Sequence, residues 1–148
     1  MNDSVATGIV SGTLGAAAHL VFSWLAQAAG ISRTTLLRVA AAVVLRNAPP
    51  MGPITIITGV TSHFVIGAVF GVGLAWLMAG TGRDWAVVKG LAYGAFLWLV
   101  PYSLITPFFV PDVIVRPDAP SALVLLASHL VYGYVTVRTA LALRFSTR

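Results

Sequence analysis

The chain contains no cysteine, and this absence removes several kinds of chemistry at once. Disulfide bonds, iron–sulfur clusters, thiolate zinc sites and cysteine nucleophiles all need a sulfhydryl group. A fold held by covalent cross-links is therefore excluded. The chain has to be held together by packing and hydrogen bonding alone.

Acidic residues are almost as scarce. The four that occur lie outside the long apolar runs of the chain: Asp3, Asp84, Asp112 and Asp118. A Ser-His-Asp triad would need an acid at the same depth as a histidine. A glycine-rich phosphate loop followed by Lys and Ser or Thr is also missing. We therefore expect no enzymatic activity and no bound cofactor.

Charge of either sign is low. Charged residues make up 9% of the chain, whereas apolar residues make up 58% and the mean hydropathy is +0.92. A soluble fold with so few charges could not cover its surface, so we expect the lipid bilayer to be the main partner. The net charge of +5 comes from nine Lys and Arg that flank apolar runs. They form no basic patch, and we expect no binding to nucleic acid.

Four apolar runs have the length of a membrane span: residues 6–29, 55–78, 87–109 and 121–143. A run of about 23 residues gives ~35 Å of helix, enough for a ~30 Å hydrocarbon core. The runs are continuous and do not alternate, which argues against strands. The sequence predicts an all-α, polytopic membrane protein, with residues 1–148 forming one four-helix bundle.

Two segments interrupt this pattern. Residues 32–47 place Arg38 and Arg46 on one stripe of an apolar helix, with Arg33 off it. We expect an amphipathic helix in the membrane interface there, with a helical connector in water as the alternative. Pro101 and Pro107 fall in the last third of the third run, which predicts a kinked or unwound segment.

Small residues recur at four-residue spacing, which brings helix backbones close together in lipid. In the second run Gly59, His63, Gly67 and Gly71 form one row, since residues four apart share a helix face. This row predicts a packing seam and places His63 among the helices. The predicted packing glycines are Gly8, Gly12, Gly67, Gly71, Gly90, Gly94 and Gly133.

A short motif of a small residue, histidine, two apolar residues, an aromatic residue or Ile, and a second small residue recurs in the spans. It carries His19, His63 and His129, and the third span keeps the frame with Gly90 in place of histidine. Counted along helices that enter from opposite sides, the three histidines fall at one depth. They predict a polar layer inside the membrane. Hydrogen bonding between helices, a proton- or ion-responsive site, and metal or haem ligation all stay open.

From residue 59 to residue 143 the arrangement resembles the YagU-like inner-membrane proteins and related small four-span bacterial proteins. The resemblance rests on His63-Phe64-x-x-Gly67, on Lys89-Gly90-Leu91-Ala92-Tyr93-Gly94, and on Ser128-His129-Leu130-Val131-Tyr132. It implies a membrane location and four spans, and no defined activity. That family often carries acidic residues just before the last span, whereas here the nearest acid is Asp118.

These observations lead to two expectations about function. The first is a structural or accessory subunit of the bacterial cytoplasmic membrane, with both termini in the cytoplasm. Such a subunit would join a larger membrane complex or self-associate through Gly8 and Gly12 or Gly67 and Gly71. The alternative is a small transporter or channel whose polar path is lined by His19, His63 and His129.

Overall fold

The fold is described from a computed structural model that covers residues 3–45, 50–109 and 117–145. All regular secondary structure in these ranges is helical. The elements are α1 (Ser4–Ala28), α2 (Leu36–Ala42), α3 (Pro53–Thr81), α4 (Ala86–Leu97), the π-helix η1 (Trp98–Ile105), α5 (Thr106–Phe109) and α6 (Ala119–Phe145).

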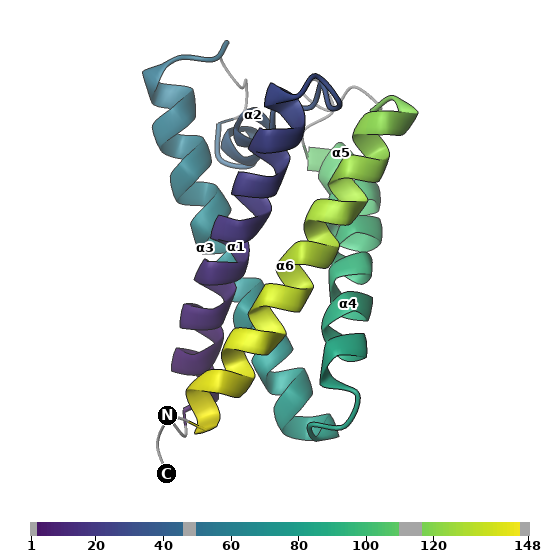
Figure 1. Cartoon of the computed structure of the whole chain (residues 1–148). Coiled ribbons are helices and arrows are strands. Elements are labelled where there is room, and N and C mark those ends of the chain that lie inside the picture. The colour runs from purple at the N-terminus through teal and green to yellow at the C-terminus, as the bar shows by residue number, and fades with distance from the viewer. Residues whose placement is uncertain (1–2, 46–49, 110–116, 146–148) are drawn as a thin grey trace.

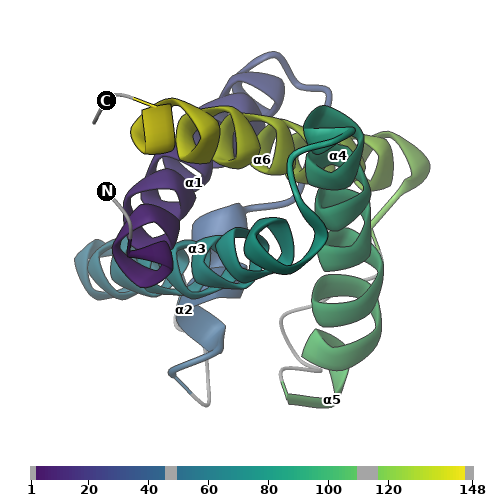
Figure 2. The same cartoon turned by 90° about the horizontal axis from the view of Figure 1, so that it is seen from below.

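The long helices lie side by side, with α1 between α3 and α6 and with α4 on the far side of α6 (Figure 1). The backbones of helices α3 and α4 approach each other at few points, although the two helices follow one another in the chain. The start of α1 and the end of α6 lie at one end of the molecule, whereas α2 lies at the other (Figure 1). Seen from below, α5 continues the ribbon that begins with α4, and α2 lies behind α3 (Figure 2).

Within the described residues, four helices are long and apolar enough to cross a membrane: Ser4–Ala28, Pro53–Thr81, Ala86–Phe108 and Ala119–Leu143. This part of the prediction is confirmed, and it suggests a multi-pass membrane protein. The distribution of side chains agrees with it. Large apolar side chains such as Trp24, Ile57 and Phe108 face outward, whereas Ser11, Ser128 and other small polar residues are buried. This is the reverse of a protein that folds in water.

Helices α1 and α3 touch through glycine backbones. A Cβ atom added to Gly71 would collide with the carbonyl of Gly8 and the backbone of Gly12, and one at Gly12 would collide with the carbonyl of Gly67. The predicted glycines therefore meet each other within the chain. They are not free for the self-association that the sequence allowed at these positions, so a dimer would need another surface.

A second seam of the same kind joins α4 to α6. A Cβ at Gly90 would lie 2.7 Å from the carbonyl oxygen of Gly133, and a Cβ at Gly94 would collide with the carbonyl of His129. At Gly59 the row predicted in α3 meets α2, because a Cβ there would collide with the carbonyl of Leu37. One face of α3 thus contacts two different helices.

Helix α2 is shorter than predicted. The expected helix over residues 32–47 begins at Leu36, and residues 46 and 47 lie outside the described residues. The start predicted at Ser32 is wrong because the Ser32 hydroxyl accepts a hydrogen bond from the N–H of Thr34, which forms a local turn. Val39, Ala40, Ala41 and Ala42 are buried and Arg38 is exposed, so α2 packs against α3 with its apolar face.

The third span changes its winding at the predicted proline. From Trp98 to Ile105 the chain is a π-helix with Pro101 inside it. Proline has no N–H for the usual helical bond, and the wider π turn accommodates that loss. The hydroxyls of Ser103 and Thr106 donate to the carbonyls five residues earlier, those of Trp98 and Pro101, at 2.7 Å each. The kinked or unwound segment predicted here is therefore a π-helix, whose hydrogen bonds join residues five apart instead of four.

Asp118 lies at the start of α6 and not beside the histidines. Its carboxylate accepts a bond of 3.1 Å from the N–H of Ser121, whose hydroxyl in turn accepts from the N–H of Arg33. Hydrogen bonds from the Ser121 hydroxyl and N–H, and then the Arg33 charge, lower the pKa of Asp118. Asp118 and His129 are eleven residues apart along the helix, which is ~16 Å. The Asp118 carboxylate is therefore too distant to pair with the His129 imidazole.

We expect Gly71→Ala to destabilise the protein and Gly80→Ala to leave it unchanged or slightly more stable. The new methyl group at residue 71 would meet the α1 backbone, whereas a Cβ at Gly80 of the same helix meets nothing within 4 Å. Overpacking of this kind costs about 1–3 kcal/mol, and removing an exposed helical glycine gains about 0.5–1 kcal/mol.

The measurement is the unfolding midpoint of each purified variant in the same detergent. Equal midpoints for the two variants would mean that α1 and α3 do not touch through Gly71.

Candidate functional site

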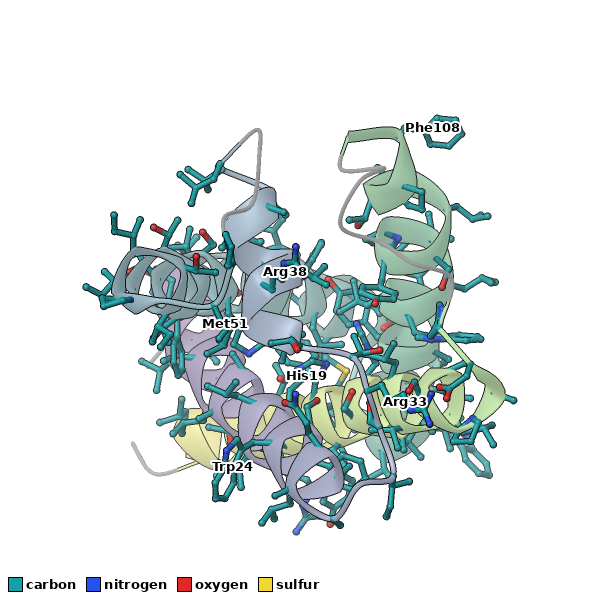
Figure 3. The ribbon with its side chains drawn as sticks, turned by 90° about the horizontal axis from the view of Figure 1, so that it is seen from above. His19, Trp24, Arg33, Arg38, Met51 and Phe108 are labelled. Carbon is teal, nitrogen blue, oxygen red and sulfur yellow. The ribbon has the colours of Figure 1, made fainter. Side chains whose placement is uncertain are left out.

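The structure brings the three predicted histidines together. The ring centroid of His19 lies 5.2 Å from that of His63 and 4.7 Å from that of His129. They come from α1, α3 and α6, and the α1–α3 glycine seam and the α1–α6 contact hold those helices at this spacing. Figure 3 shows His19 among the helices, whereas Trp24 and Phe108 point outward.

Backbone carbonyls fix the protonation of two of these rings. Nε2 of His63 lies 2.9 Å from the carbonyl oxygen of Ala16, and Nδ1 of His129 lies 2.7 Å from that of Leu125. A carbonyl oxygen only accepts, so these two nitrogens carry hydrogen. A neutral imidazole has one N–H. Nδ1 of His63 and Nε2 of His129 are therefore acceptors.

His19 joins the cluster through a serine. Its Nε2 lies 3.0 Å from the Ser128 hydroxyl, which lies 2.8 Å from the Leu125 carbonyl oxygen. Both hydrogens find an acceptor when the Nε2–H of His19 donates to the Ser128 hydroxyl oxygen and the Ser128 hydroxyl donates to the Leu125 carbonyl. The 3.4 Å approach of His19 Nε2 to His129 Nδ1 is then a contact between two donors. Nδ1 of His19 is buried and has no partner among the described residues.

The three rings line a pocket of about 130 Å³. One site for a water molecule needs ~10–15 Å³ on this measure, so there is room for several waters or a small ligand. Its other walls come from every helical element: Ala16, Leu36, Ala40, Val43, Ile66, Gly67, Phe70, Leu97, Pro101, Tyr102, Thr106 and Tyr132. No residue of this lining carries a formal charge.

The pocket does not continue toward the end of the molecule where α1 begins. On that side Leu74, Met78, Ala86 and Val137 form a buried apolar cluster, and Leu74 and Val137 have no exposed surface. The histidines lie ten helical steps from the starts of α3 and α6, which is ~15 Å. The polar cluster therefore lies deep between the helices, closed on one side and covered by α2 on the other.

Metal and haem ligation were alternatives for these histidines. Among the described residues, no group of three or more His, Cys, Asp or Glu side chains is arranged to hold a metal ion. The geometry gives ligation no support.

Sequence reasoning missed the tyrosines. The hydroxyl of Tyr132 donates to the Gly67 carbonyl at 2.7 Å, and that of Tyr93 donates to the Phe70 carbonyl at 2.8 Å. Both occupy the aromatic position of the repeated motif, which was the available signal. Tyr102 was missed as well. It projects from the π-helix, and its ring lies 5.7 Å from that of His129.

We expect Ser128→Ala to lower stability by about 1–3 kcal/mol, because His19 would lose the acceptor of its only proton. Ser11→Ala is the matched control. Ser11 is also fully buried, but its hydroxyl bonds only to the Gly8 carbonyl of its own helix, at 3.3 Å. Unfolding in mixed micelles measures both. A loss at Ser11 as large as that at Ser128 would contradict the hydrogen-bond chain.

Comparisons of this chain with models of known protein families, with curated proteins and with solved structures found no match. The resemblance to YagU-like proteins therefore stays a prediction.

Proposed function

We propose that this protein is a multi-pass protein of a bacterial cytoplasmic membrane that binds a small molecule in the pocket lined by His19, His63 and His129. The proposal combines four helices of spanning length with a polar cluster at their centre. With four spans both termini lie on one side, and we place that side in the cytoplasm.

The observation that carries the proposal is the meeting of three imidazoles at one pocket of about 130 Å³. Ionisable side chains inside membrane spans are costly and commonly functional. Within the described residues, the buried Nδ1 of His19 has no partner, which costs about 1–3 kcal/mol. A purely structural role, as an accessory subunit, gives no reason to keep these polar groups.

Transport is the second candidate, since ionisable side chains inside a membrane commonly mark ion pathways. An ion or proton path needs polar groups through the whole thickness of the membrane. Here the apolar cluster around Leu74 and Val137 fills the space between the histidines and one end of the molecule. Binding without passage therefore agrees better with the arrangement of the side chains.

Native mass spectrometry of the protein in nanodiscs cut directly from membranes tests for a bound molecule. We expect a one-to-one adduct on the wild type and its loss in Ala40→Leu, because Ala40 lines the pocket and leucine would fill part of it. Val44→Leu is the control on the same segment. Val44 is 64% exposed and does not line the pocket. An adduct that survives in Ala40→Leu would contradict binding at this site.

Proteoliposomes with trapped pyranine, a pH-sensitive dye, separate binding from transport. After an external pH jump we expect the wild type to leak protons no faster than protein-free vesicles. Replacing His63 and His129 by Leu should change nothing in this assay. A flux that depends on pH and disappears in the double variant would establish the transporter instead.

A further inference from the structure

The pocket has more hydrogen-bond acceptors than donors. Nδ1 of His63 and Nε2 of His129 are acceptors, because the other nitrogen of each ring donates to a backbone carbonyl. Neither nitrogen has a hydrogen-bond partner among the described residues. Neither is fully buried there, unlike Nδ1 of His19. Both are therefore open to the space that the rings line.

The neighbouring hydroxyls do not correct this imbalance. Tyr132 and Thr106 line the pocket, but their hydrogens are directed at the carbonyls of Gly67 and Pro101, at 2.7 Å each. Tyr102 offers one hydroxyl beside His129. The site can thus accept more hydrogen bonds from a guest than it can donate, and no charge in its lining would hold an ion.

The rest of the lining is apolar and reaches the outer surface. Ile66 and Phe70 of α3 face Pro101 of η1 across the pocket, where α3 and the third span scarcely touch. At the rim Val43 is 53% exposed. The neighbouring Leu104 and Ile105 of η1 are exposed as well. A guest that enters here crosses a surface which, in a membrane protein, lies against lipid.

We infer that the pocket takes a lipid-soluble molecule with a neutral hydroxyl group, an alcohol or a phenol, and that this hydroxyl donates to His63 Nδ1 or His129 Nε2. The inference rests on the proposed binding function and names its ligand class. Molecules that only accept hydrogen bonds, such as ethers, esters and quinones, bind less well. Anions are excluded by the neutral, acceptor-rich lining.

Two probes that differ only in whether they can donate a hydrogen bond test this inference. 4-Octylphenol has the hydroxyl, and 4-octylanisole replaces it with a methyl ether on the same apolar body. The binding of each tritiated probe is measured to nanodiscs that hold the full-length protein and to empty nanodiscs. The difference between the two removes the contribution of the probe's solubility in lipid. We expect the protein to prefer the phenol about tenfold, which is about 1.4 kcal/mol, the size of one hydrogen bond.

Variants without a side-chain acceptor test the two nitrogens. His63→Leu and His129→Leu each remove one acceptor, and the Ala16 and Leu125 carbonyls lose only a side-chain donor. We expect the double variant to remain helical in the same nanodiscs and to lose the preference for the phenol. Thr13→Val, on an exposed face of α1, should keep the preference.

Three results would overturn the inference: equal or tighter binding of the anisole, a preference that survives in the double variant, or no binding of either probe. Tight binding of Zn²⁺ alone that disappears in the same double variant would overturn it too, since the nitrogens would then be metal ligands. In each of these cases an adduct displaced by Ala40→Leu would still support a binding pocket, with a ligand of another class.

Discussion

The fold depends on direct contact between glycine backbones. Gly8 and Gly12 of α1 meet Gly67 and Gly71 of α3 with no side chain between them, and the same contact recurs between α4 and α6. In a lipid environment the helices gain nothing from hiding apolar surface, so close van der Waals contact has to hold them together. This contact also sets the spacing at which the rings of His19 and His63 face each other.

A single backbone carbonyl organises the polar centre. The Leu125 oxygen accepts from both Ser128 and His129, one turn further along α6, and through Ser128 it also orients His19. The cluster is thus built on rigid helix and not on loops, which favours a fixed arrangement of donors and acceptors. The π-helix supplies the opposite wall, where its wide turn places Pro101 and Tyr102 at the pocket.

Composition and spacing predicted the helices, the glycine seams and the common depth of the histidines, because these follow from helix length and a four-residue period. The protonation of the rings could not be predicted. It depends on which carbonyl each nitrogen reaches, and Ala16 lies 47 residues from His63. The start of α2 was predicted four residues too early, at residue 32, because the local turn in which the Ser32 hydroxyl accepts from the N–H of Thr34 leaves no pattern in the sequence. The pocket arises from the weak contact between α3 and the third span, which no local pattern encodes.

His19 and Ser128 are 109 residues apart in the chain, although they touch in the folded protein. The helix that carries His19 is synthesised before the helix that carries its partner. During synthesis the His19 imidazole therefore has no acceptor for its proton until α6 has been made. The polar centre is thus completed only when α6 packs against α1.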